Sequence, residues 1–324
     1  MRSLLLLLAL VILSALAFAW PGLFGSAASD PFLASRSGLW ALIALAMFAI
    51  GWRLPGDEVA RVARRWPSVL GGTAIQYASM PLLAVATASV ARLDADATVG
   101  LMLVGCVPGA MASNVLTLMA RGNVSYSVGL TTAATLASPL VVPLALRWTL
   151  GGVSVDFPAV EAMRQLALFV VVPVGLGHAI GRLPRRRHRL DGPVASLVAN
   201  LVILWIIAVV VASNRDRLAG PSLQLITALL AVNLLGYLAG DLGGRLLRVD
   251  PPMRRALTLE VGMQNAGLGT TMALTLFPDR PAAAIPCALY TFGCMLTGTA
   301  LASWWSIRAD RSPADPRPED AQRV

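Results

Sequence analysis

One carboxylate stands in a long apolar stretch near the C-terminus. Glu260 lies in the run TLEVGMQNAGLGTT (258–271), next to the side-chain amides of Gln264 and Asn265 and among three glycines. An ionisable side chain at membrane depth costs ~2.5–3.5 kcal/mol, so its presence indicates a functional site. Glycines around an amide pair predict an interrupted helix, which a membrane tolerates only where the backbone lines a cavity or is buried in protein. The alternative is a tightly packed helix with Glu260 at its end.

Hydroxyl and amide side chains interrupt three other apolar runs, and they are Gln76, Ser113, Asn114, Ser127 and Thr131. A Pro-Gly pair, Pro108-Gly109, precedes Ser113 and predicts a second break. Ser127 and Thr131 are four residues apart, as are Glu260 and Gln264, so each pair is expected on one helix face. Oxygen ligands without imidazole or thiolate suit a hard cation, and one carboxylate balances a monovalent ion. Taken singly, such hydroxyls more often bond within their own membrane helices.

The composition indicates a polytopic α-helical membrane protein. Of 324 residues, 56% are hydrophobic and only 13% are charged, about half the charged share of a soluble domain. The net charge of +9 comes from arginines in short loops between apolar runs. These positions are typical of topology signals and not of a nucleic-acid-binding face.

Ten apolar segments are expected to span the membrane: residues 2–20, 37–54, 68–90, 97–119, 124–149, 159–182, 192–212, 221–247, 253–277 and 283–307. The first also fits a secretory signal peptide, an alternative that its composition leaves open. With the N-terminus inside, 19 of the 26 arginines fall in cytoplasmic segments, which predicts that both termini are cytoplasmic. The charged, proline-rich tail 308–324 is expected to be disordered.

The basic loop 183–191 divides these segments into two sets of five, about 1–150 and 159–307. An odd number of crossings gives the two halves opposite orientations, and the fourth segment of each carries the expected break. Interrupted segments at matching places in inverted halves point to the binding site of a secondary transporter.

Other polar groups have simpler interpretations. Cys106, Cys287 and Cys294 lie in apolar segments without a CxxC spacing and are expected to be buried. Asp241 precedes Arg245 by four residues, which favours a local ion pair. No phosphate-binding glycine loop with Lys, HExxH motif or Ser/His/Asp set occurs, so an enzyme is not expected.

Two stretches resemble the signature regions of the bile acid:sodium symporter family. They are VGCVPGAMASNVLTLMARGNVSYSVGLTTAATLASPLVVP (104–143) and TLEVGMQNAGL (258–268), within a resemblance that extends over about residues 1–307. The resemblance implies two inverted five-helix repeats that form a ten-helix transporter domain. Spans 1, 2, 6 and 7 would form a panel, and the others a core in which the interrupted fourth and ninth spans cross.

The resemblance also implies two Na⁺ sites that share Glu260. The first would use Ser113, Asn114, Ser127, Thr131 and Glu260; the second would use Gln76, Glu260, Gln264 and the backbone carbonyls of Val261 and Met263. Substrate would meet Asn265, with Met111 and Ala112 beside it. Met111 stands where bacterial relatives often carry a small hydroxyl, and Cys294-Met295 where relatives can carry His-Asn, so the substrate side is expected to differ.

The expected function is sodium-coupled symport of an organic anion, bile acid-like or a small carboxylate, by alternating access in the inner (plasma) membrane. Two Na⁺ would be the coupling ions, with no further cofactor and no obligate protein partner. One alternative is a proton-coupled transporter with Glu260 as proton carrier. Another is a membrane sensor that transports nothing.

Overall fold

The computed structural model describes residues 2–24, 29–54, 64, 66–152, 155, 157–182, 191–218 and 222–311. The regular structure of these residues is helical, with one isolated bridge between Gly109 and Gln264, so the expected all-α class is confirmed. Six of their helices are long and apolar enough to cross a membrane: Pro31–Trp52, Trp66–Ala91, Val124–Gly152, Ala159–Gly181, Leu223–Leu246 and Pro281–Arg308. Shorter apolar helices cover Leu8–Phe24, Ala95–Cys106, Leu197–Ser213 and Ala266–Leu276. The chain is a multi-pass membrane protein.

The elements follow one another along the chain in two runs of similar length. The first run is α1 (Arg2–Phe24), α2 (Pro31–Ala34), η1 (Ser35–Gly38), α3 (Leu39–Arg53), α5 (Trp66–Ala91), α6 (Ala95–Cys106), α7 (Ala112–Met119), α8 (Val124–Thr149) and η2 (Leu150–Gly152). The second run is α9 (Ala159–Leu166), η3 (Ala167–Val171), α10 (Val172–Gly181), α11 (Asp191–Ser213), α12 (Arg215–Leu218), α13 (Leu223–Leu246), α14 (Pro251–Gly262), α15 (Ala266–Leu276), η4 (Pro281–Ala283) and α16 (Ala284–Arg311).

Each of the ten expected segments coincides with one or more helices, whose outer ends differ from the expected ends by a few residues. The last helix continues to Arg311 instead of ending at 307, and the Arg308 guanidinium lies 4.0 Å above the Trp304 ring in this extension. The rest of the predicted tail, 312–324, lies outside the described residues, as do positions 183–190 of the basic loop. A short π-helical turn, η3, interrupts the sixth segment just before Pro173. Proline cannot donate to the carbonyl four residues earlier, and a π-turn absorbs that irregularity.

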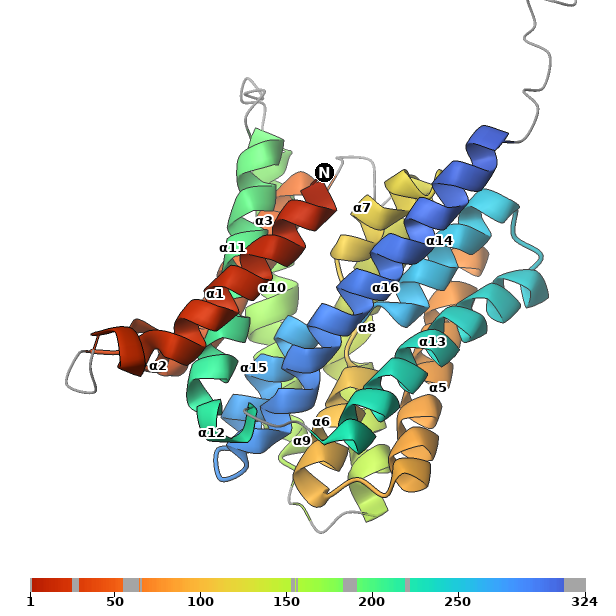
Figure 1. The fold of residues 1–324 in the computed structure, drawn as a ribbon. Helices are drawn as coiled ribbons and strands as arrows, with labels where there is room; N and C mark the ends of the chain where they lie inside the picture. Colours follow the sequence, from red (N-terminus) through yellow and green to blue (C-terminus); the bar gives the residue numbers. More distant parts are fainter. Residues whose placement is uncertain are drawn as a thin grey trace, which may run out of the picture.

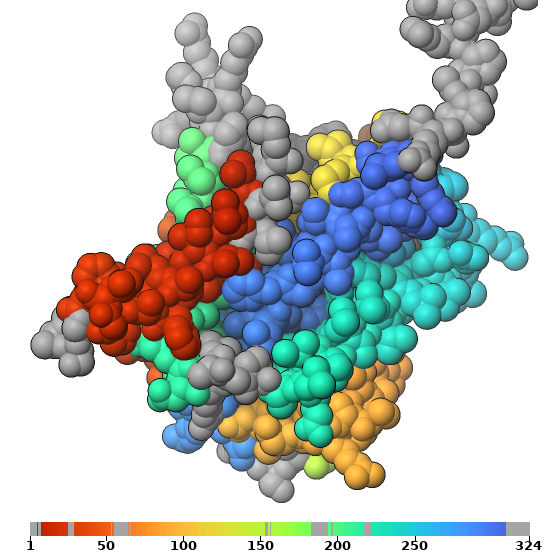
Figure 2. Space-filling model, in the orientation of Figure 1, coloured from red at the N-terminus to blue at the C-terminus, as the bar shows by residue number. Residues whose placement is uncertain are grey.

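The helices pack in two groups, which we call group A and group B (Figure 1). Group A contains α1, α3, α10 and α11, with α3 against α10 and α11 and with α1 against α11. Group B contains α5 to α8 and α13 to α16. The groups touch where α11 packs on α15 and α16, and where α1 meets α16, as the red and blue surfaces of Figure 2 show. The start of α1 and the end of α16 lie at the same end of the molecule (Figure 1).

A polar cluster holds one end of group A together. Pro21 lies inside α1 and has no N–H for the carbonyl of Ala17, four residues earlier. The Arg215 guanidinium takes that place, with Nε and Nη2 donating to the Ala17 carbonyl at 2.9 and 2.6 Å. Arg215 also pairs with Asp30, whose carboxylate caps α2 by accepting from the N–H groups of Phe32 and Leu33. One side chain of α12 therefore joins α1 and α2.

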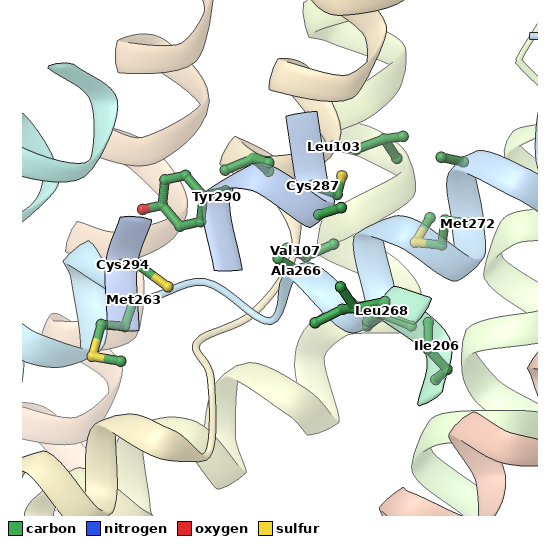
Figure 3. Close-up of a cluster of buried hydrophobic side chains, with 14 of the residues drawn as sticks. Leu103, Val107, Ile206, Met263, Ala266, Leu268, Met272, Cys287, Tyr290 and Cys294 are labelled. Carbon is green, nitrogen blue, oxygen red and sulfur yellow. The ribbon is translucent and has the colours of Figure 1, made fainter. Parts of the chain in front are cut away.

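The core of group B surrounds the place in the middle of the molecule where α6 ends and α15 begins. Figure 3 shows Leu103, Val107 and Cys287 of α16 close together, with Leu268 and Met272 of α15 beside them. All five are buried. Irregular backbone at this depth is thus surrounded by protein and not by lipid, as membrane energetics require.

Two expectations about single residues are confirmed. All three cysteines are buried and free. Asp241 pairs with Arg245 at 2.8 Å, and also with Arg254 of α14 at 3.1 Å.

Candidate functional site

The fourth and ninth expected segments are each broken near their middle, as predicted. Val107 precedes Pro108 and is extended (φ −71°, ψ 157°), because the proline ring disfavours the helical conformation of the residue before it, so α6 ends at Cys106. In the other break Met263 is extended (φ −119°, ψ 101°), and α14 ends at Gly262. Asn265 then caps α15 by accepting from the Leu268 N–H at 3.1 Å.

The two breaks cross and bind each other through their backbones. The Ala110 N–H donates to the Met263 carbonyl at 2.8 Å, and the Asn265 N–H donates to the Pro108 carbonyl at 2.8 Å. This antiparallel bridge satisfies polar groups that helix ends otherwise leave without partners. Residues about 155 positions apart thereby become neighbours.

Four helix ends meet at this crossing. The C-terminal ends of α6 and α14 bring partial negative charge, and the N-terminal ends of α7 and α15 bring partial positive charge. A cation is therefore favoured near the first pair of ends and an anion near the second. The outer ends are also tied: Arg280 pairs with Asp96 at 3.0 Å, and Arg255 donates to the Ala120 carbonyl at 3.0 Å.

Glu260 lies in the last turn of α14 and is 0% exposed. Its Oε2 accepts from Ser113 Oγ at 2.5 Å and its Oε1 from Thr131 Oγ1 at 2.7 Å. Gly109 makes room for this carboxylate, because a Cβ there would overlap Oε1 and lie 2.7 Å from Cδ. Of the ion pairs found among the described residues, none includes Glu260. A buried carboxylate without a cationic partner is costly, so the site favours a small cation.

Two other residues expected at the first sodium site, Asn114 and Ser127, have no direct hydrogen bond to this carboxylate among those found between the described residues. Thr131 Oγ1 is also 3.1 Å from the Ser127 carbonyl, which confirms that these two residues share a helix face. Ser127 Oγ accepts from Thr117 at 3.3 Å. Asn114 Nδ2 approaches Met111 Sδ at 3.7 Å, while Asn114 Oδ1 is buried without a partner. That free oxygen suits a cation ligand.

The residues expected at the second sodium site, apart from the shared Glu260, form hydrogen bonds of their own. Gln76 Nε2 donates to Gln264 Oε1 at 3.1 Å, and Gln264 Nε2 donates to the Val261 carbonyl at 2.6 Å. Gln76 Oε1 is buried without a partner. The expectation that Glu260 and Gln264 share a helix face is wrong, because α14 ends between them at Gly262 and Gln264 lies in the extended segment.

The three residues expected to contact substrate, Met111, Ala112 and Asn265, are partly exposed, and so is Asn114 of the first expected ion site. The other residues expected at the ion sites, such as Glu260 and Gln264, are buried. Met111 also lines a small cleft between the two helix groups, whose lining residues are Ile50, Leu54, Met111, Asn114, Val128, Thr131, Thr132, Thr135 and Val174. The lining is apolar with hydroxyls and one amide, and it reaches Thr131, a direct partner of Glu260.

Three residues at the crossing were not expected from the sequence: Thr117 beside Ser127, and Asn233 and Tyr290, which both donate to the Gly262 carbonyl. Gly109 was predicted as part of the break, but its position beside Glu260 was not. Asn233 carried the same signal as Gln76, a lone amide in an apolar helix. A tyrosine or threonine in such a helix is too common to single out.

The donor set is entirely oxygen, from hydroxyls, amides, backbone carbonyls and one carboxylate, which suits a hard monovalent cation. No group of three or more His, Cys, Asp or Glu side chains that could hold a transition metal occurs in the described part of the chain. Broken helices that cross around a buried acid are typical of secondary transporters.

Comparison with known proteins agrees with this class. The profile described as "Sodium Bile acid symporter family" matches residues 40–221. The chain is 33% identical over 311 residues to the "Uncharacterized sodium-dependent transporter YocS" of Bacillus subtilis (strain 168), an alignment that covers 94% of this chain and 91% of that protein. It is 29% identical over 278 residues to the "Probable sodium/metabolite cotransporter BASS1, chloroplastic" of Arabidopsis thaliana, covering 85% and 69%. It is 27% identical over 247 residues to the "Sodium/bile acid cotransporter 4" of Mus musculus, covering 74% and 56%.

The chain therefore belongs to the sodium bile acid symporter family. Its general activity is sodium-dependent transport across a membrane. The relatives are named as transporters and not as enzymes, in agreement with the expectation from the sequence.

Proposed function

We propose that this protein is a symporter that couples the entry of an organic anion to Na⁺. The observation that carries the proposal is the buried Glu260 carboxylate at the crossing, bonded to two hydroxyls and to no cationic side chain among the described residues. Na⁺ would supply the missing positive charge. Two Na⁺ would share Glu260: one with Ser113, Asn114, Ser127 and Thr131, and one with Gln76, Gln264 and the carbonyls of Val261 and Met263.

The anion would bind on the more accessible side of the crossing. Bound Na⁺ neutralises Glu260 and orders the two breaks, and the N-terminal ends of α7 and α15 then face the anion. Asn265, Met111 and Ala112 would contact it. Relatives are named for bile acids and for metabolites. Met111 lines the cleft, and a side chain of this size there would favour a small carboxylate over a bile acid.

Transport would proceed by alternating access between the two helix groups. Group A corresponds to the panel and group B to the core, within ten spans arranged as two inverted repeats, about 1–150 and 159–307. The cleft at the boundary supports this assignment, since it lies between α3 and α10 on one side and α7 and α8 on the other. Both termini would be cytoplasmic and the protein would lie in the plasma membrane. The start of α1 and the end of α16 lie at the same end of the molecule, which is consistent with an even number of spans.

The test uses purified protein in detergent, with thermal stability measured in NaCl and in KCl at equal ionic strength. Preferential binding to the folded state stabilises it, by ~2.7 kcal/mol at 100 times Kd. We expect Na⁺-specific stabilisation of the unchanged protein and its loss in Glu260→Gln. Asp241→Asn is the matched control, because it makes the same change at an ion pair away from the crossing.

Na⁺-specific stabilisation that survives in Glu260→Gln would contradict the proposed role of this carboxylate. The same assay identifies the cargo when small carboxylates and bile acids are added: a compound that stabilises only in Na⁺ is the expected result. Uptake into proteoliposomes that a pH gradient drives without Na⁺ would support Glu260 as a proton carrier instead.

A further inference from the structure

The carbonyl of Gly262 is held by two side chains that the proposed sodium sites do not use. Asn233 Nδ2 and Tyr290 Oη each donate to it at 2.7 Å. Gly262 is the last residue of α14, so its carbonyl has no helical N–H to accept from. Both donors belong to the second half of the chain, one on α13 and one on α16, and both side chains are buried.

A small network fixes these donors in turn. Thr297 Oγ1 donates to Asn233 Oδ1 at 2.6 Å, which orients the amide so that its nitrogen faces Gly262. Tyr237 Oη lies 3.2 Å from the same Thr297 hydroxyl. The Tyr237 ring fills the space beside Gly262, where a Cβ would overlap ring atoms. Figure 3 shows Tyr290 and Cys294 of α16 on the same side as Met263, which begins the extended segment between α14 and α15.

Three successive carbonyls around this point have three different partners. The Val261 carbonyl accepts a hydrogen bond from the Gln264 side-chain amide, three residues further along the same segment. The Met263 carbonyl accepts one from the Ala110 N–H of the other break. The Gly262 carbonyl lies between them. The peptide between Gly262 and Met263 shares one Cα atom with the peptide of the Val261 carbonyl and another with the peptide of the Met263 carbonyl. Rotation of this middle peptide would therefore change the orientation of both neighbouring carbonyls, and glycine resists such rotation least.

We infer that Asn233 and Tyr290 are positioning residues that set the sodium affinity of the crossing through the Gly262 carbonyl. The inference rests on the proposed function, in which the Val261 and Met263 carbonyls are Na⁺ ligands. Neither Asn233 nor Tyr290 touches the ion. They hold the peptide between the two ligands, so that the ligands are already oriented before Na⁺ arrives.

The experiment measures the Na⁺ concentration for half-maximal thermal stabilisation, at constant ionic strength with KCl. Tyr290→Phe removes one hydroxyl and should raise this concentration about three- to tenfold, the effect of losing one buried hydrogen bond. Thr297→Val frees the Asn233 amide to turn and should raise it in the same direction. Tyr126→Phe is the matched control, because its hydroxyl also donates to a backbone carbonyl, that of Ser68 at 2.8 Å, away from the breaks.

A purely structural role would lower stability in KCl in all three variants and leave the half-maximal Na⁺ concentration unchanged. That result in both Tyr290→Phe and Thr297→Val would overturn the inference while leaving the proposed function standing. If the unchanged protein shows no Na⁺-specific stabilisation, the proposed function fails first and the inference fails with it. If Tyr290→Phe does not fold, Thr297→Val decides alone.

Discussion

Arg215→Met should destabilise the protein by an amount that depends on the residue at position 21. Arg215 donates to the Ala17 carbonyl, which Pro21 leaves without its helical partner, and it pairs with Asp30. Methionine keeps much of the side-chain volume and removes every donor. In a Pro21→Ala background the new N–H of residue 21 can bond to the Ala17 carbonyl, so part of the loss should disappear.

The structure sets the magnitude of each part. The side chains of Arg215 and Asp30 are 17% and 12% exposed, so the pair is close to the buried limit, where loss of one partner costs about 3 kcal/mol. Ala17 is 0% exposed, and a buried carbonyl left without a donor costs ~1–3 kcal/mol. We therefore expect about 4–6 kcal/mol for Arg215→Met and about 3 kcal/mol in the Pro21→Ala background. The difference is a coupling of ~1–3 kcal/mol.

The four proteins of this cycle can be compared by denaturant titration in mixed detergent micelles, followed by tryptophan fluorescence. Arg245→Met is the control, because Arg245 is 62% exposed and its pair with Asp241 should contribute ~0–1 kcal/mol. A coupling below about 0.5 kcal/mol would refute the reasoning, since it would mean that Pro21 does not create the vacant carbonyl that Arg215 fills.

Two further predictions concern Gly109 beside Glu260 and the Asp30 carboxylate. Gly109→Ala should raise the half-maximal Na⁺ concentration on the order of tenfold or more, because a Cβ would displace the Glu260 carboxylate; an unchanged value in the NaCl thermal-shift assay would contradict this. Acid should destabilise group A through Asp30. Burial raises the pKa of Asp30, but the Arg215 hydrogen bond and the capped N–H groups together lower that pKa below 3.8. The stabilisation is therefore complete above about pH 4 and lost as pH falls through the lowered pKa, and melting temperatures of Arg215→Met should show a smaller acid-induced drop.

Much of the architecture was predictable because its causes are local. Apolar runs predict where the helices lie, including the six that are long enough to cross a membrane, and Pro108 ends α6 through the restriction it places on Val107. The glycines and amides after Glu260 similarly predict the second break. These signals depend on residues within a few positions of each other, which a sequence displays directly.

The pairings at the crossing were not predictable in the same way. No local rule states that the Ala110 N–H meets the Met263 carbonyl, or that Asn233 faces Gly262. The one wrong placement has a clear origin: the four-residue spacing of Glu260 and Gln264 implies a shared face only if the helix continues, and it ends at Gly262. The local composition therefore predicts the approximate position of a helix break. Tertiary contacts decide which residue is the last one in the helix.

The short segment from Glu260 to Met263 makes hydrogen bonds to both halves of the chain. The Glu260 side chain accepts hydrogen bonds from Ser113 and Thr131, which belong to the first half. Its backbone at Gly262 is bonded to α13 and α16, which belong to the second half. A cation that binds the carboxylate and the adjacent carbonyls would therefore act on both halves at once. All of these contacts lie within group B, so Na⁺ would hold the two halves of group B in one arrangement. Coupling then requires that this arrangement differ in its contacts with group A, because a ligand shifts an equilibrium only through contacts that differ between its states.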